Sequence, residues 1–241
     1  MKRQTETGKM KAAAHRFAAT KSLCMVWAAV CLLCALVTGC RLPTAAAVNL
    51  HAPYRPDNVF LAAPSLPGDV KRVAVLPVVC DARRTDLAAG RGDLQPVLLA
   101  ELIKAKRFEV VQVPTKALWR LTGRADWAGD EILPPGLLGS LEKKYGCDAV
   151  LFCQLTEFRA YPPLAIGWRL KLVDVRGKKV IWAGDEQFDA GRPAVMAAAL
   201  RYQEHEQRQL GDDTTDWLTV NSPRWFGQYS LASLFNTLPA R

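Results

Sequence analysis

Histidine is scarce in this sequence, with three among 241 residues. Only His51 and His205 lie beyond residue 40, and His205 stands between Glu204 and Glu206, a pattern typical of a solvated helix face. The short motifs of serine hydrolases, nucleotide-binding proteins and zinc peptidases are also missing. Because a weak nucleophile needs a nearby base, few catalytic schemes remain open. We predict a protein that is not an enzyme and that holds no cofactor and no metal. The alternative is an enzyme with an unfamiliar site.

Acidic side chains are almost absent from the first 39 residues, where Glu6 stands against six Lys and Arg. These residues carry +5 of the formal +9 charge, which leaves +4 for residues 40–241. So small an excess does not indicate a polyanion partner, and we predict no nucleic-acid binding. Half of the residues are hydrophobic and 23% are charged, which excludes a disordered chain and a multi-span membrane protein.

Charge is missing altogether between Ser22 and Gly39. A basic head, an apolar middle and small residues at the end are typical of an export signal. The sequence Val37-Thr38-Gly39-Cys40 resembles the lipobox of bacterial lipoproteins. That resemblance implies that residues 1–39 are a signal peptide, that cleavage occurs before Cys40, and that lipid such as palmitate is attached to its thiol. An uncleaved signal-anchor helix is the alternative, because eighteen apolar residues can just span a bilayer.

The residues after Cys40 indicate a location and a tether. Arg41 stands where lipoproteins kept in the inner membrane usually carry aspartate, so the chain resembles those anchored at the periplasmic face of the outer membrane. Residues 41–69 hold five prolines and show no sustained periodicity, which predicts a tether with short packed pieces around Val59-Phe60-Leu61. We expect a single periplasmic domain over residues 70–241.

The first half of that domain alternates strands with helices. Apolar runs predict buried strands at 72–80, 108–113 and 148–155. Asp93 is the expected cap of a helix with Pro96 in its first turn. A short helix over 114–121 and a helix that opens at Pro134-Pro135 and stops at Gly146 complete the pattern. Strand-helix-strand-helix-strand predicts a parallel sheet.

The second half changes period. Alternation over Trp168–Val175 and again over Val180–Ala183 predicts an antiparallel hairpin. With a two-residue turn at Arg176-Gly177, Trp168 would share a face with Ile181, whereas Arg169, Lys171 and Trp182 would lie on the other face; a slip of one residue would reverse this. Helices over Pro193–Leu210 and after Ser222-Pro223 close the chain, and we expect the last to pack on the sheet. The fold class is therefore mixed α/β, in two or three layers.

Three passages carry a resemblance to a family. They are Arg72–Pro77, Lys143–Phe152 and Leu172–Trp182. Together they resemble envelope lipoproteins with a TolB amino-terminal-like domain, a group that includes the curli secretion-channel subunit and the penicillin-binding-protein activator lipoproteins. The resemblance covers roughly residues 70–190. It implies the α/β fold, but members of one fold do different work. Only one hairpin of the kind that builds a curli-type pore is present, so channel activity is not carried over.

The expected function is binding. We predict a lipid-anchored protein whose domain binds and supports another envelope protein or assembly; a self-assembling ring subunit is the alternative. Tryptophan and arginine are frequent where proteins bind each other. The candidate partner contacts are Trp127, Trp182, Trp217, Arg169 and Lys171. Cys80, Cys147 and Cys153 remain beyond Cys40, an odd number that cannot pair completely.

Overall fold

The computed structural model describes residues 54–210 and 222–241, so Cys40 and Trp217 lie outside the described residues. The described chain forms one mixed sheet with the strand order β1-β6-β5-β4-β2-β3. The strands are β1 (Val59–Leu61), β2 (Arg72–Val75), β3 (Glu109–Gln112), β4 (Ala149–Arg159), β5 (Ala165–Asp174) and β6 (Val180–Asp189). Within the described ranges the helices are α2 (Thr85–Lys104), α3 (Thr115–Thr122), α4 (Leu137–Tyr145), α5 (Pro193–Leu210) and α7 (Pro223–Phe235).

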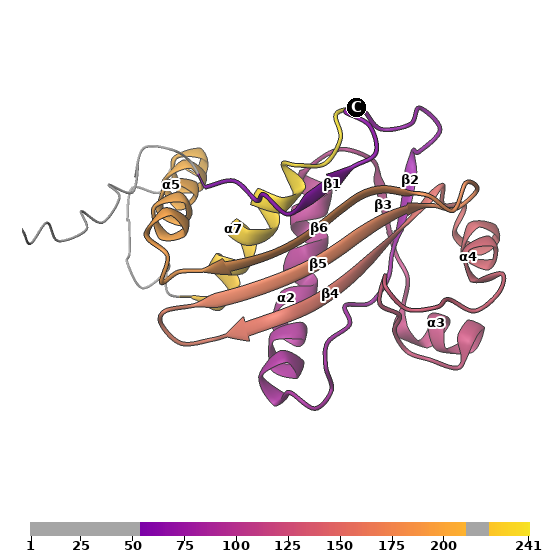
Figure 1. Ribbon diagram of the computed structural model, residues 1–241, viewed down its shortest axis with the longest axis horizontal. Coiled ribbons are helices and arrows are strands. Elements are labelled where there is room, and N and C mark those ends of the chain that lie inside the picture. The colour runs from indigo at the N-terminus through magenta and orange to yellow at the C-terminus, as the bar shows by residue number, and fades with distance from the viewer. Residues whose placement is uncertain (1–53, 211–221) are drawn as a thin grey trace, which may run out of the picture. The chain divides into compact units, whose positions relative to one another are not determined.

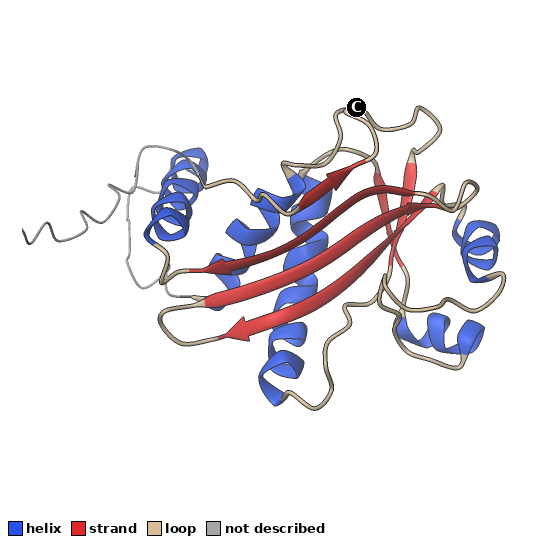
Figure 2. Ribbon diagram, viewed as in Figure 1, coloured by secondary structure: helices blue, strands red, loops and turns tan. Residues whose placement is uncertain are grey.

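The sheet has a parallel part and an antiparallel part. β2 pairs in parallel with β3 and with β4, which confirms the predicted parallel arrangement. β4, β5, β6 and β1 then follow one another in antiparallel order. Figures 1 and 2 show the three long strands β4 to β6 running side by side across the domain. The mixed α/β class expected from the sequence is therefore present.

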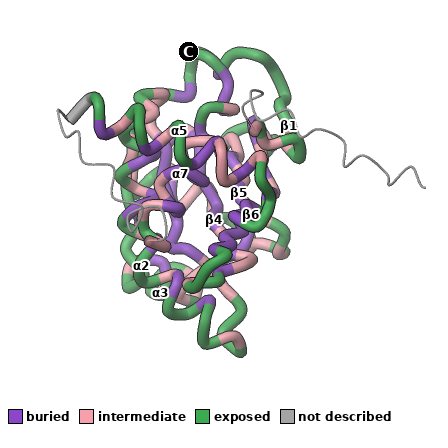
Figure 3. The backbone as a smooth tube through the Cα atoms, turned by 90° about the vertical axis from the view of Figure 1, so that its left-hand side faces the viewer, coloured by how far each residue is buried: buried purple, intermediate pink, exposed green. Residues whose placement is uncertain are grey.

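Helices cover the two faces of the sheet unequally. α2 and α7 lie on one face, where Leu98 and Leu234 join Trp168 in the larger core. α3 and α4 lie on the other face, where Leu118 and Leu141 pack with Phe152 in a smaller second core. In Figure 1, α3 and α4 gather at the end of the sheet near the β5–β6 turn, and α5 lies at the opposite end. Among the described residues, helices therefore cover the second face of the long strands at one end only. Figure 3 shows buried and intermediate residues along β4 to β6 and exposed residues in the surrounding loops.

The α7 helix is fastened to the sheet through two tryptophans. Trp168 Nε1 donates to Ser230 Oγ at 3.1 Å, and Trp182 Nε1 donates to Thr237 Oγ1 at 3.0 Å. Both indole rings are fully buried. The predicted packing of the last helix on the sheet is confirmed, and Ser222 with Pro223 does mark the start of that helix.

The predicted facing of Trp182 is wrong. Leu172 pairs with Trp182, so Trp182 lies on the α7 side together with Trp168, and not beside Arg169 and Lys171. The physical reason is the turn. Val173 pairs with Val180 after an irregularity in register, so the loop is longer than the two residues expected, and a change of one residue moves a side chain to the other face.

The α2 helix begins earlier than expected. Its first residue is Thr85, so Asp93 and Pro96 lie within the helix and Asp93 is not its cap. The buried stripe continues toward the amino end through Leu87 and Gly90 at helical spacing. A Cβ at Gly90 would lie 2.4 Å from the Phe158 ring, so this glycine allows the first turns of the helix to approach β4. Tertiary packing outweighs the low helix propensity of glycine and proline here.

Part of the expected tether belongs to the fold. β1 pairs with residues 182–184 of β6, and Leu66 is buried. Tyr54 Oη donates to Glu186 Oε1 at 2.7 Å, and the Asp57 amide donates to Glu186 Oε2 at 3.2 Å. Burial and the Glu186 carboxylate raise the pKa of Tyr54. The folded part thus includes residues from Tyr54 onward instead of beginning at residue 70. Across the described ranges, the structure contains no helix with the length and apolarity needed to span a bilayer.

Candidate functional site: an apolar groove with a cationic rim

Among the described residues, one face of the β5 strand is only partly covered. Along it, Trp168, Leu170 and Leu172 are buried under α2 and α7, and the intervening Arg169 and Lys171 point to the other side, where they are partly exposed. This is the period of two expected of a strand buried on one face. The structure therefore brings two of the predicted partner contacts side by side on the open face. Their role in binding stays a prediction.

A loop before α4 is anchored to this face by charge. Lys171 Nζ donates to the Gly129 carbonyl at 2.6 Å, and Arg169 Nη1 lies 3.3 Å from Asp130 Oδ2. Arg169 Nε also donates to Asp185 Oδ2 at 2.7 Å, and this hydrogen bond raises the pKa of the guanidinium. Arg169 is thus balanced by two carboxylates, whereas Lys171 is bonded to a neutral carbonyl. Lys171 therefore adds positive charge to the adjoining surface.

A groove of about 670 Å³ opens next to Lys171. One wall is the segment 133–139, which leads into α4, and the other is the end of the β5–β6 hairpin. Buried Phe152 and Val175 form part of the floor, which belongs to the second core. Half-buried apolar side chains line the walls: Leu133, Leu138, Val173 and Val180. An exposed depression of this kind favours binding of apolar groups.

The rim of the groove is mainly cationic. Lys171, Arg176 and Lys178 line it, against one carboxylate, Glu142. Arg176 Nε donates to Glu142 Oε1 at 3.1 Å, so that pair is close to neutral. Lys178 stands in the turn with φ at 52°, a left-handed conformation that is uncommon for residues other than glycine. The lining therefore carries an excess of two positive charges over an apolar floor.

The tryptophans named from the sequence do not form this surface. Trp127 is only 7% exposed: its Nε1 donates to Thr122 Oγ1 at 3.0 Å and the Arg124 guanidinium lies 4.1 Å from its ring. Trp127 and Trp182 are both buried, so neither offers a free ring to a partner, and these two expected contacts are corrected. Trp217 lies outside the described residues.

Sequence reasoning also missed exposed groups. Trp119 on α3 is 60% exposed, because Leu118 faces the second core and the next helical residue is rotated away by about 100°. The sequence also did not predict that Leu138, Val173, Arg176 and Lys178 would line one groove. A cationic turn directly after an alternating strand is the one local signal that pointed to them.

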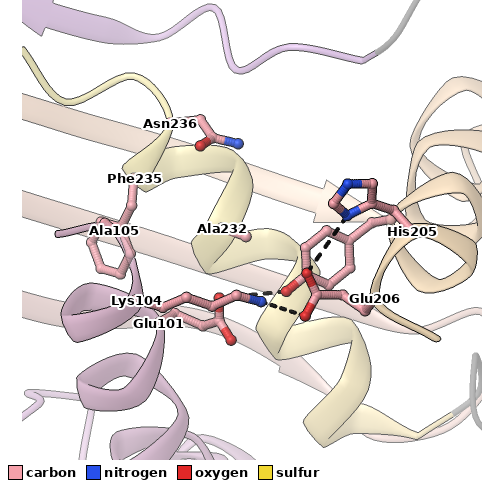
Figure 4. Close-up of a pocket in the computed structure, with 9 residues that line it drawn as sticks. Glu101, Lys104, Ala105, His205, Glu206, Ala232, Phe235 and Asn236 are labelled. Atoms are coloured by element: carbon pink, nitrogen blue, oxygen red, sulfur yellow. Dashed lines mark hydrogen bonds and ion pairs between the residues drawn. The ribbon is translucent and has the colours of Figure 1, made fainter. Parts of the chain in front are cut away.

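A second hollow, of about 270 Å³, lies where α2, α5 and α7 meet (Figure 4). Glu101 and Lys104 come from α2, and Tyr202 and Glu206 come from α5. Lys104 Nζ is paired with Glu206 Oε2, and Tyr202 Oη donates to Glu101 Oε2 at 3.4 Å. Burial is the main reason why the pKa of Glu101 is raised. These contacts join α5 to α2, which is a sufficient structural role for the cluster.

This cluster predicts a pH-dependent contribution to stability from Glu101. A carboxyl whose pKa is raised on folding stabilises the folded state below its ordinary value of about 4.3, and that contribution is lost as the pH rises through the raised value. We expect Glu101→Gln to be more stable than the wild type at pH 7, with the difference shrinking toward pH 5. Urea unfolding of both proteins at the two pH values measures this. A difference that is constant with pH, or that grows toward pH 5, would contradict it.

The described cysteines are free thiols, and two of the three are buried. Burial raises the pKa of Cys147 and of Cys153, which disfavours the thiolate that a nucleophile or a metal ligand requires. In the part of the chain that the structure describes, no group of three or more His, Cys, Asp or Glu side chains is arranged to hold a metal ion.

Comparison with known proteins finds similarity to solved structures alone, and at low sequence identity. No family and no curated protein matches the sequence. Similar solved structures include the PelC dodecamer from Paraburkholderia phytofirmans, at 13% identity and a TM-score of 0.39 over 78% of this chain and 95% of that chain. Lipoprotein GNA1162 from Neisseria meningitidis has 18% identity and a TM-score of 0.40 over 56% of this chain and 99% of that chain. The LpoB C-terminal domain from Salmonella enterica has 15% identity and a TM-score of 0.33 over 49% and 82%. TM-scores below 0.5 do not establish a shared fold.

Proposed function

We propose that this chain is a lipid-anchored protein of the bacterial cell envelope that works by binding and not by catalysis. In this proposal Cys40 carries the lipid at the periplasmic face of the outer membrane. The domain that begins by Tyr54 then binds and supports another envelope protein or assembly. Thirteen residues separate Cys40 from Tyr54, and a fully extended chain of that length spans at most about 45 Å. The domain therefore acts close to the membrane.

The groove is the observation that carries the proposal. It combines apolar walls, which bind by excluding water, with an excess of positive charge that selects the partner. A membrane anchor strengthens such a site, because two proteins confined to one thin compartment meet at a high effective concentration. A modest interface is then enough for stable association.

Site-specific cross-linking in cells tests the proposal. A photo-reactive amino acid is placed at Leu138 in the groove, and in a control protein at Tyr161, which is 81% exposed and does not line the groove. We expect a discrete adduct at position 138 that mass spectrometry identifies as an envelope protein, and no such adduct at position 161. Equal patterns at both positions, or no adduct at Leu138, would exclude the groove as a binding site.

A further inference from the structure

The groove selects for one chemistry. Its walls consist of apolar side chains, and the charge of Lys171 and Lys178 at its rim is not matched by carboxylates of the lining. A fitting occupant is therefore a short peptide that joins acidic residues to large apolar residues. Acidic groups alone would leave the walls exposed to water, and apolar groups alone would leave the rim without counter-charge.

The chain itself contains such a segment. Residues 211–221 read Gly-Asp-Asp-Thr-Thr-Asp-Trp-Leu-Thr-Val-Asn, with three aspartates, no cation, and then Trp217, Leu218 and Val220. The segment carries three negative charges, and the groove lining carries an excess of two positive charges. Tryptophan is also the side chain most often found to dominate a protein interface. The segment and the groove thus complement each other in both charge and apolar character.

The segment cannot reach the groove of its own chain. The start of α7, which directly follows it, lies at the beginning of β5, since a Cβ at Gly227 would be 3.7 Å from Ile166. The groove lies at the other end of β5, ten residues and about 30 Å away. Figure 1 likewise shows α5 at the end of the sheet opposite to α4. Eleven residues held at both ends extend no more than about 20 Å from their anchors.

We infer that the groove of one copy binds residues 212–220 of a second copy. The inference rests on the proposed function of the groove as a protein-binding site. The groove and the start of α7, which follows the segment, lie at opposite ends of the domain, so the contact is head to tail. Each bound pair leaves one groove and one segment free. Repetition of such a contact closes into a ring or continues as an open chain.

Mixing of two complementary variants tests the inference. The groove variant carries Leu138→Glu and Lys178→Glu, and the segment variant carries Asp213→Lys and Trp217→Ala. Full-length protein in detergent is measured by sedimentation velocity and light scattering. We expect the wild type to assemble in a concentration-dependent manner, and each variant alone to associate at least about tenfold more weakly. An equimolar mixture should form a dimer of one copy of each variant and stop there, because only one intact groove meets one intact segment.

Each outcome has a definite meaning. Circular dichroism and the urea midpoint show whether both variants fold, and Lys178→Glu alone replaces the groove variant if Leu138→Glu does not fold. A wild type that remains a monomer up to about 100 µM overturns the inference. Assembly that neither variant weakens, or variants that do not complement each other, overturn it as well. Binding of an anionic lysolipid to the wild type and not to the groove variant, with assembly unchanged, would also overturn the inference.

The same measurements separate failure of the inference from failure of the proposed function. Cross-linking from Leu138 to another envelope protein, with the chain remaining single, would overturn the inference and leave the binding function standing. A monomeric protein without any adduct at Leu138 would overturn both the inference and the proposed function. Cross-linking from Leu138 to Trp217 or its neighbours in a second copy supports the inference and the role of the groove as a protein-binding site.

Discussion

Replacing Cys40 with alanine is expected to abolish incorporation of labelled palmitate. The sequence Val37-Thr38-Gly39-Cys40 supplies one thiol directly after a charge-free apolar segment. Each acyl methylene buried in a membrane contributes about 0.8 kcal/mol, and two or more chains give stable anchoring where one chain does not. Loss of the thiol should therefore remove the lipid anchor. We also expect the leader to remain attached, so that the protein migrates as a larger precursor.

A matched control lies six residues earlier. Cys34 has the same side chain within the apolar segment, and Cys34→Ala should leave labelling, cleavage and membrane fractionation unchanged. Palmitate labelling that persists in Cys40→Ala would contradict the lipid attachment. A wild type that carries no label and retains residues 1–39 would instead identify an uncleaved signal-anchor helix.

Local signals in the sequence located most elements of the fold. Pro193–Leu210 is a helix over its full predicted length, and Gly146 ends α4 in a left-handed conformation with φ at 61°. Alternation along β5 identified a strand with one buried face. These features depend on residues that are neighbours in the chain, because caps, turns and periodicity are properties of short segments.

Features that depend on distant residues could not be predicted. The facing of Trp182 follows from the irregular pairing near Leu172, and the early start of α2 depends on the fit of Gly90 against Phe158. The groove is assembled from the segment 129–139, α4, β4 and the β5–β6 hairpin. Each contribution is an ordinary apolar or basic residue in its own segment. Only their juxtaposition in the folded domain makes a site, and no single stretch of sequence contains it.

Replacing Trp168 with alanine is expected to lower the free energy of unfolding by about 4 kcal/mol. The indole is fully buried between the sheet and α7, and its Nε1 donates to Ser230 Oγ, which is itself fully buried. Alanine would leave a cavity and remove one partner of that hydroxyl. Domains of this size are stable by about 5–15 kcal/mol, so such a loss is a large share of the total. The midpoint of thermal unfolding should fall by about 8–16 °C.

Trp119→Ala is the matched control, because the same side chain is 60% exposed on α3 and has little apolar area to lose. Its effect on the free energy of unfolding should stay within about 0.5 kcal/mol. Urea and thermal unfolding followed by far-ultraviolet circular dichroism compares both variants without relying on tryptophan fluorescence. Equal losses in the two variants would contradict the fastening of α7 to the sheet through Trp168. A large loss confined to Trp168→Ala would mean that the larger core holds α7 in place on the sheet. The same core orders β5, and the far end of β5 forms part of the groove.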